Sequence, residues 1–291
     1  STVAHGEILS IQVDDARAMT GVVAVYTAAD LGLDDREPAM KFYPATMARP
    51  FLARDRVRFV GEPLAVVLAD DQYLAADAAD AVWVDVEPLR AVVSMADALA
   101  AETLLFDDLD HNICWEQAVR TPIDFADCEV VVEADLVNSR VAAVSIEARV
   151  ATATYEDDRL TCWASSQGAH SHREDVAKAL GLDPDAVRVV VTDIGGGFGA
   201  KGMASEEEIV VAHLARLHGR PVRWVESRTE NLIGYVHGRA QNQTITLGGT
   251  RDGHITHYRL RVLQDSGAYP KWGAFLPEFP RWMASGVYDI A

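Results

Sequence analysis

Short apolar runs alternate with amphipathic stretches through the first third of the chain. Apolar residues at every second position predict strands, and apolar residues three to four positions apart predict helices. The expected strands are 22–26 and 82–86 with a further apolar run at 64–68, and the expected helices are 75–81 and 93–101. This alternation predicts a small α/β region over residues 1–105.

Turn-forming residues then separate this region from one that is richer in strands. Asp, Asn and Pro gather at 106–123, a composition that suits a linker. Beyond the linker, the expected strands are 128–136, 141–146, 151–155, 160–164 and 187–191. The expected helices are 174–180 and 206–217, and an expected hairpin of 243–247 and 255–263 turns at Asp252-Gly253.

The chain is acidic, with a formal net charge of −18 over 291 residues. Phosphate binding needs a basic face, so this charge argues against a nucleic-acid partner. No apolar run reaches the 18 residues of a membrane span, and we expect no span. Cys114, Cys128 and Cys162 are widely spaced and form no CxxC pair. They predict reduced thiols in a cytoplasmic protein, and no iron–sulfur cluster on this chain itself.

The most informative segment is the glycine run at 195–199, in which Phe198 stands among four glycines. The run lies between an expected buried strand and an expected amphipathic helix. Glycine lets bare backbone approach a ligand and adopts positive φ at little cost. Free N–H groups near a helix N-terminus favour an anionic or polar cofactor.

The run resembles two nucleotide-binding motifs in part. The P-loop pattern fails, because Ala200 and Gly202 flank Lys201 where Gly and Ser or Thr are required. The dinucleotide pattern fits only loosely, with Ala200 as its last small residue and Glu226 as a late acidic residue. A Rossmann-type nucleotide-binding module therefore stays open at this point, as does a simple connecting turn.

The glycine run is one of six segments that are informative together. In chain order they are 58–67, 87–89, 162–170, 194–201, 220–230 and 265–269. In this order they resemble the molybdenum-binding large subunit of the xanthine dehydrogenase family, closest to the branch of carbon monoxide dehydrogenase and the bacterial aldehyde dehydrogenases with separate subunits. The resemblance implies an α+β fold: a small α/β hammerhead-like domain (1–105), a linker (106–123) and the first, incomplete part of a mixed α/β molybdopterin-binding domain (124–291).

The resemblance also implies a function and its cofactors. The whole enzyme would oxidise an aldehyde, carbon monoxide or an N-heterocycle with water-derived oxygen, at a molybdenum–molybdopterin cytosine dinucleotide. FAD and 2Fe-2S clusters would reside on a medium and a small partner subunit. The remainder of the molybdenum subunit, in the same chain or a separate one, would supply the catalytic base. We therefore expect this chain, as a fragment or as half of a split subunit, to be inactive alone.

The resemblance assigns cofactor-binding roles to four residues. Gln167 would point at an oxygen or sulfur ligand of molybdenum, and the backbone N–H of Gly199 would donate to such a ligand. Gly197 and Phe198 would form the part of the loop at the metal end of the cofactor. No catalytic residue and no direct metal ligand is expected in this chain. Gly202 stands where purine-hydroxylating members carry a glutamate, which argues against xanthine as the substrate.

Other polar residues near these segments are interpreted as structural. Glu147-Ala148-Arg149 matches a Glu-Pro-Arg segment of the family and is expected to form an internal ion pair. Arg228 and Glu230 are expected to form a second pair that braces the loop. A non-catalytic scaffold, or degenerate paralogue, that only binds partners remains the other alternative.

Overall fold

The computed structural model describes residues 1–118, 122–288 and 290. The chain forms two compact units, each of which draws on separate segments of the sequence. The first comprises Ser1–Arg36, Arg49–Ala91 and Ala142–Val236, and the second comprises Glu37–Ala48, Val92–Val141 and His237–Ala291. Because both units take segments from either side of the expected linker, the domain ranges drawn from the sequence stay predictions.

The N-terminal part of the first unit contains two small antiparallel sheets. Strands β1 (Gly6–Gln12), β3 (Arg56–Val57) and β5 (Trp83–Pro88) form one, and β2 (Val22–Thr27) and β4 (Ala65–Ala69) form the other. The helices of this part are α1 (Asp14–Ala18), α2 (Ala28–Leu31) and α3 (Gln72–Asp80). The strands and the helix expected here are confirmed, because each apolar run finds a neighbour to pack against.

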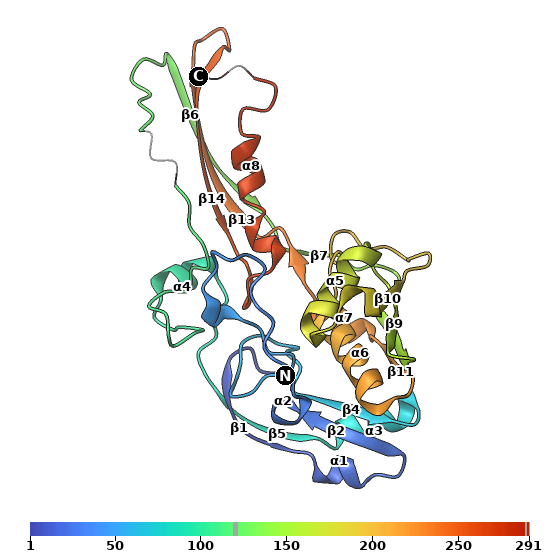
Figure 1. The fold of residues 1–291 in the computed structure, drawn as a ribbon. Coiled ribbons are helices and arrows are strands. Elements are labelled where there is room, and N and C mark those ends of the chain that lie inside the picture. Colours follow the sequence, from blue (N-terminus) through green and yellow to red (C-terminus); the bar gives the residue numbers. More distant parts are fainter. Residues whose placement is uncertain (119–121, 289, 291) are drawn as a thin grey trace. The chain divides into compact units, whose positions relative to one another are not determined.

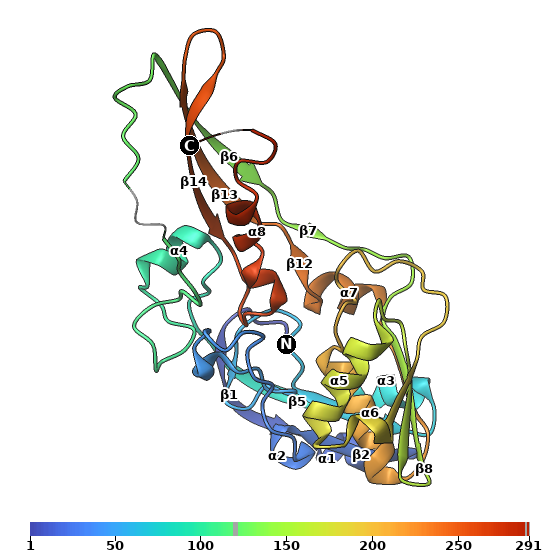
Figure 2. The same ribbon diagram turned by 45° about the horizontal axis from the view of Figure 1, so that its top comes forward.

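The rest of the first unit is built on a four-stranded sheet in the order β10-β9-β8-β11. The strands are β8 (Val150–Glu156), β9 (Arg159–Ala164), β10 (Val187–Val190) and β11 (Val222–Val225). Its helical elements are α5 (Ala169–Leu180), η2 (Pro184–Ala186), α6 (Glu206–His218) and α7 (Arg228–Gly234). Helices α5 and α6 lie on one face of the sheet, as Figure 1 and Figure 2 both show.

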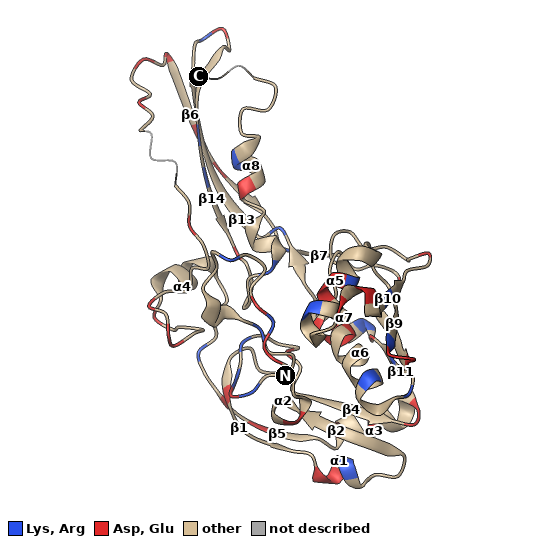
Figure 3. Cartoon of the chain, in the orientation of Figure 1, with Lys and Arg blue, Asp and Glu red and all other residues tan. Residues whose placement is uncertain are grey.

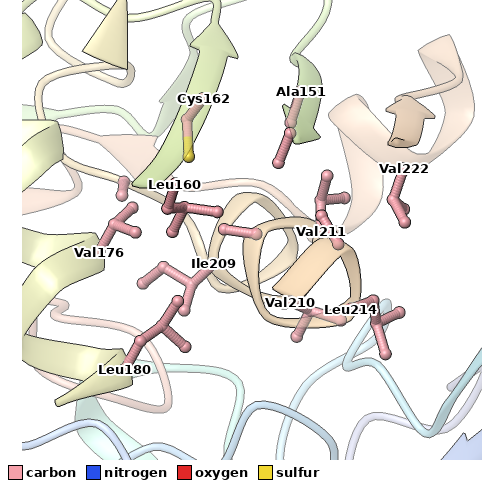
Figure 4. Packing of buried hydrophobic residues seen from close by; sticks show 14 of the residues in the cluster. Ala151, Leu160, Cys162, Val176, Leu180, Ile209, Val210, Val211, Leu214 and Val222 are labelled. Carbon is pink, nitrogen blue, oxygen red and sulfur yellow. The ribbon is translucent and has the colours of Figure 1, made fainter. Parts of the chain in front are cut away.

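The core of this unit lies between the sheet and those two helices. Leu160 of β9 and Ile209 of α6 are fully buried, and Val176 of α5 packs in the same cluster (Figure 4). Ser205 and Glu208 form a capping box that starts α6, and Gly219 ends the helix in the left-handed conformation. The amphipathic pattern at 206–217 thus predicted α6 almost to the residue.

The second unit is organised around a three-stranded antiparallel sheet in the order β14-β13-β6. The strands are β6 (Val130–Asn138), β13 (Gln241–Gly249) and β14 (Ile255–Gln264). Its helical elements are η1 (Ala45–Met47), α4 (Met95–Ala100), η3 (Trp272–Phe275) and α8 (Glu278–Trp282). The expected hairpin is confirmed: β13 and β14 pair along their length, and Gly253 at the turn has φ 93°.

Two expectations about the elements are wrong. The strand at 141–146 shrinks to β7 (Val141–Ala142), because Val144 takes φ 43°, which no strand residue adopts. A second short strand, β12 (His237–Gly238), lies later in the chain. Helix α5 begins at Ala169 rather than at 174, since its polar first turns carry no apolar periodicity. Among the residues described, no helix combines the length and apolar character needed to cross a membrane.

Candidate functional site

Two loops meet at one edge of the four-stranded sheet. Strands β9 and β10 are parallel neighbours, so their carboxyl ends reach the same edge. The loop after β9 carries Gln167, and the longer loop after β10 carries the glycine run. The backbone of Gln167 donates to the carbonyl oxygen of Lys201 over 2.9 Å, which joins the two loops.

The side chain of Gln167 is directed at the glycine loop. Its Oε1 accepts hydrogen bonds from the backbone N–H of Gly199 (2.9 Å) and of Lys201 (3.1 Å). Because both partners are donors, the amide oxygen must face the loop and Nε2 must face away from it. Gln167 is exposed, and its Nε2 has no hydrogen-bond partner in the described part of the chain. This amide therefore offers two N–H donors to a ligand.

The tip of the glycine loop is a tight turn held in an uncommon conformation. Ala200 N–H donates to the Gly197 carbonyl oxygen (3.0 Å), and the two residues between them, Phe198 and Gly199, have φ of 52° and 88°. Two positive φ values in succession are typical of a type I′ turn. A bulky residue rarely adopts positive φ, and such backbone strain is found most often at functional sites.

Phe198 is not a core residue, since 77% of it is exposed. Its ring lies against Gly196, where an added Cβ would come within 2.9 Å of the ring. Gly197 is required for another reason: a Cβ there would lie 2.5 Å from Gln167 Oε1. The glycines at 196 and 197 thus allow the exposed ring and the amide to approach the loop backbone closely.

The backbone around Gly199 is not covered by other parts of the described chain. A Cβ added at Gly199 would meet no atom within 4 Å, so the backbone is bare and open there. The exposed ring of Phe198, an open stretch of backbone and the Gln167 amide, whose Nε2 has no hydrogen-bond partner among the described residues, belong to these two joined loops. The N–H of Gly199 itself donates to Gln167 in this structure, so the donor that the site presents is Gln167 Nε2.

The helix after the loop does not contribute an anion site. Residues 200–205 separate Gly199 from the first residue of α6, and the first turn of α6 carries Glu206, Glu207 and Glu208. Three carboxylates and an occupied capping box leave the helix N-terminus unsuited to a further anion. The expected contribution of a helix N-terminus at the glycine run is therefore wrong.

A buried lysine lies directly behind the loop. The side chain of Lys201 is 1% exposed, and its Nζ donates to the Glu147 carbonyl oxygen (2.8 Å) and to Ser165 Oγ (2.7 Å). Nζ also lies 3.3 Å from Glu147 Oε2. From the sequence, Lys201 is notable only as a failed P-loop lysine, because hydropathy places lysine at the surface. No pattern in the sequence marks it as buried.

Glu147 connects this lysine to the start of the loop. Its Oε2 accepts from the N–H of Gly195 (2.8 Å) and from Ser165 Oγ (2.7 Å). Burial alone would raise the pKa of Glu147, but the hydrogen bonds from Gly195 and Ser165 and the charge of Lys201 lower it below its ordinary value. Glu147 is thus held as a carboxylate.

Arg149 forms the expected internal ion pair, although not with Glu147. Its Nε donates to Glu226 (2.9 Å) and its Nη1 to Glu207 (2.6 Å), with a further contact from Nη2 to Glu226. The guanidinium also lies 4.0 Å from the centre of the Tyr235 ring. Because Glu226 is buried and occupied by Arg149, it is not available to a nucleotide ribose. Figure 3 shows acidic and basic residues gathered around α5, α6 and α7.

The second expected pair, Arg228 with Glu230, is wrong. Arg228 instead donates to the carbonyl oxygens of Ser145 and Ile146, each over 2.7 Å. Glu230 accepts from the N–H of Ser227 and so closes the capping box of α7. Arg228 still braces the segment that leads into Glu147.

Within the described ranges, no group of three or more His, Cys, Asp or Glu side chains could hold a metal ion. His172 is buried, and burial together with the charge of Arg36 lowers its pKa to about 4, whereas His170 is exposed. The site therefore presents neutral donors and an aromatic ring. The chemistry of these groups suits the binding of a cofactor through hydrogen bonds.

Two protein families match the chain. The molybdopterin cofactor-binding domain matches residues 106–291, and the hammerhead domain of aldehyde oxidase and xanthine dehydrogenase matches residues 1–90. Together the two matches extend over nearly the whole sequence.

Individual relatives agree with these matches. The nicotine 6-hydroxylase large subunit of Paenarthrobacter nicotinovorans is 34% identical, over 100% of this chain and 37% of that protein. The carbon monoxide dehydrogenase large chain of Hydrogenophaga pseudoflava is 33% identical, over 99% of this chain and 38% of that protein. The crystal structure of quinoline 2-oxidoreductase from Pseudomonas putida 86 superposes with a TM-score of 0.91 at 34% identity, covering 100% of this chain and 38% of that one. This chain spans less than two fifths of each relative.

Proposed function

The chain belongs to the aldehyde oxidase and xanthine dehydrogenase family of molybdenum-binding large subunits, and on this premise we propose that it forms one side of the molybdenum site of a hydroxylase. The observation that carries the proposal is the joining of Gln167 to the glycine loop. The Oε1 of this amide is fixed by two backbone donors, which leaves its Nε2 directed away from the loop.

The residues have separable tasks in this proposal. Gln167 Nε2 would donate to an oxygen or sulfur ligand of the metal, and Phe198 would pack against the flat part of the bound group. Gly197 and Gly199 carry no side chain that would keep the Gln167 amide or the bound group away from the loop backbone. When bound, the molybdenum–molybdopterin cytosine dinucleotide supplies the centre that transfers water-derived oxygen to the substrate and accepts two electrons. Donors that are fixed before the reaction stabilise developing charge without reorganisation.

The proposed substrates are an aldehyde, carbon monoxide or an N-heterocycle. The named relatives include a nicotine hydroxylase, a carbon monoxide dehydrogenase and a quinoline oxidoreductase. The absence of a carboxylate at Gly202 argues against xanthine. The catalytic base belongs to the remainder of the molybdenum subunit, so the chain alone is proposed to be inactive.

The proposed assembly contains three kinds of partner. They are the remainder of the molybdenum subunit, a medium subunit with FAD and a small subunit with 2Fe-2S clusters, all in the cytoplasm. Relatives named as large subunits or large chains favour such an assembly. The strongly acidic surface, with its net charge of −18, argues against a nucleic-acid partner.

A single substitution separates the donor task of Gln167 from its task in holding the loop. Gln167→Glu keeps an oxygen for the N–H groups of Gly199 and Lys201 but replaces the outward donor with a second carboxylate oxygen. We expect kcat of the purified assembly to fall about 10²-fold with its molybdenum content retained, since loss of one such donor costs that much elsewhere.

The matched control is Gln72→Glu, the same change at an exposed position of α3. It should leave kcat unchanged. Full activity of Gln167→Glu would contradict the donor role, and a wild-type assembly without molybdenum would favour the scaffold alternative.

A further inference from the structure

We propose that the ion pair between buried Lys201 and partly exposed Glu147 is a clamp that fixes both ends of the glycine loop and thereby sets the position of the Gln167 amide. Lys201 and Glu147 act in this proposal as positioning residues, which touch neither substrate nor cofactor. The inference rests on the proposed function for its effect on turnover, but the clamp itself can be tested without it.

Glu147 contacts the loop at both of its ends. At the start, its Oε2 accepts from Gly195 N–H (2.8 Å) and its own N–H donates to the Gly195 carbonyl oxygen (3.3 Å). At the end, Lys201 Nζ donates to its carbonyl oxygen over 2.8 Å and lies 3.3 Å from the same Oε2. A Cβ added at Gly195 would lie 2.5 Å from Glu147 Cβ, so only glycine permits this approach. One residue outside the loop therefore ties its two ends together.

The contacts of Lys201 use its whole hydrogen-bonding capacity. An ammonium group has three N–H donors, and Nζ faces three oxygens: the Glu147 carbonyl, Glu147 Oε2 and Ser165 Oγ. Ser165 completes a ring, because its hydroxyl accepts from Lys201 and donates to Glu147. In some proteins a buried ion pair adds little stability compared with apolar packing but selects one geometry among several. We infer the same for buried Lys201 and Glu147, whose side chain is 35% exposed. A clamp needs such geometric selection more than stability.

The backbone of Lys201 transmits this position to Gln167. The N–H of Lys201 donates to Gln167 Oε1 (3.1 Å), and its carbonyl oxygen accepts from Gln167 N–H (2.9 Å). The amide is therefore held from two sides by the residue whose side chain is anchored on Glu147. Displacing Lys201 must displace the proposed metal-facing donor.

The test is Lys201→Met in the purified assembly, because methionine fills the buried space of the lysine stem without the charge. We expect amide hydrogen exchange in the peptide covering 194–202 to accelerate at least about tenfold, which corresponds to about 1.4 kcal/mol. We expect kcat to fall about 10²-fold with KM within about threefold, as for a misplacement of about 1 Å. The Mo(V) electron paramagnetic resonance signal should shift or broaden, with molybdenum content unchanged.

Lys41→Met is the matched control, since Lys41 is exposed. It should change none of these five readouts: amide exchange, kcat, KM, the Mo(V) signal and molybdenum content. Exchange in β8 and α6, which belong to the same unit as the loop, serves as an internal control in both variants, because unfolding of that unit would accelerate exchange there too.

A second variant keeps the proposal falsifiable if Lys201→Met does not assemble. Glu147→Gln retains an oxygen for Gly195 N–H but removes the charge that faces Lys201, so a smaller change in the same direction is expected. Glu156→Gln at an exposed position of β8 is its control. The double variant Lys201→Met/Glu147→Gln should lose no more kcat than Lys201→Met alone, because the two residues act as one unit.

The outcomes separate the clamp from the proposed function. Wild-type exchange of the loop amides in Lys201→Met overturns the clamp, whatever the assembly binds. Accelerated exchange with unchanged kcat and an unchanged Mo(V) signal overturns the link to the Gln167 donor. An intact wild-type assembly without molybdenum overturns the proposed function, and the exchange measurement still decides on the clamp.

Discussion

Two regions of the first unit are held together by different forces. Beneath α6, the core is aliphatic and its contacts are not directional: Leu160, Val176 and Ile209 pack wherever apolar surface meets. Behind the glycine loop, the support consists of ions and hydrogen bonds, with Lys201 and Arg149 almost fully buried. The aliphatic core should tolerate substitutions that keep volume, whereas the polar support should fail when either partner of a contact is removed.

The largest effect is expected at Arg149. Arg149→Met leaves the carboxylate of Glu226 buried without its cation, which should lower the free energy of unfolding by about 3–5 kcal/mol. Adding Glu226→Gln should recover a large part of the loss. Urea unfolding measures the free energy of unfolding of the single and the double variant. Arg223→Met, at an exposed position of β11, is the control. Equal stabilities of Arg149→Met and the control would remove the contrast between the two regions.

A core substitution should lower the free energy of unfolding somewhat less, and the size of this loss should depend on side-chain volume alone. Leu160→Ala is expected to lower the free energy of unfolding by about 2–5 kcal/mol, because it leaves a cavity at a fully buried position. Leu160→Met keeps the volume and should cost less than about 1.5 kcal/mol. Leu217→Ala, at a position that is 56% exposed on α6, is the control and should cost far less. A large loss in Leu160→Met would show that the core is as directional as the polar support.

Glu208 stands at the junction of the two regions and should make stability depend on pH. Burial raises its pKa to about 7 from 4.5, partly opposed by the Ser205 hydrogen bond and the charge of Arg149. Since the folded-state pKa lies above the unfolded value, its contribution is complete below pH 4.5 and is lost as pH rises through 7.

The loss from this group should amount to about 3 kcal/mol over that range. Glu208→Gln keeps an acceptor for the Ser205 N–H but removes the titration, so the stability of this variant relative to wild type should rise from pH 5 to pH 8. Urea unfolding at several pH values measures the difference. If the difference in the free energy of unfolding between Glu208→Gln and wild type does not vary with pH, the Glu208 carboxyl is exposed to water in the folded protein and this prediction is wrong.

The smallest effect is expected at the tip of the loop. Phe198→Asn puts a residue that tolerates positive φ where the exposed phenylalanine has φ 52°. The free energy of unfolding should rise by about 0.5–1 kcal/mol, as relief of such strain allows. Tyr73→Asn, which removes an exposed aromatic ring from a helix, should bring no gain. A loss of stability in Phe198→Asn would mean that the ring packs more than its exposure indicates.

The sequence predicted the apolar parts of the fold well because periodicity reports directly on packing. Helix α6 and the β13–β14 hairpin follow from apolar spacing and one turn signal. The strand expected at 141–146 failed, because a run of apolar letters does not reveal that Val144 takes positive φ. Helix α5 was predicted too short because its polar first turns hide its start.

The polar support could not be predicted in the same way. Lys201 and Glu147 are 54 residues apart in sequence, and nothing local to either indicates the other. Gln167 and the glycine loop came from the order of motifs, and the structure places the two together through hydrogen bonds. Their roles toward a cofactor remain proposals.

The most direct measurement is native mass spectrometry with metal analysis on the assembly purified from its source. We predict one molybdenum for each copy of this chain, together with a polypeptide that supplies the remainder of the molybdenum subunit and with flavin and iron–sulfur subunits. An intact assembly that contains this chain but no molybdenum would contradict the proposal, and Gln167 and Phe198 would then have only structural roles.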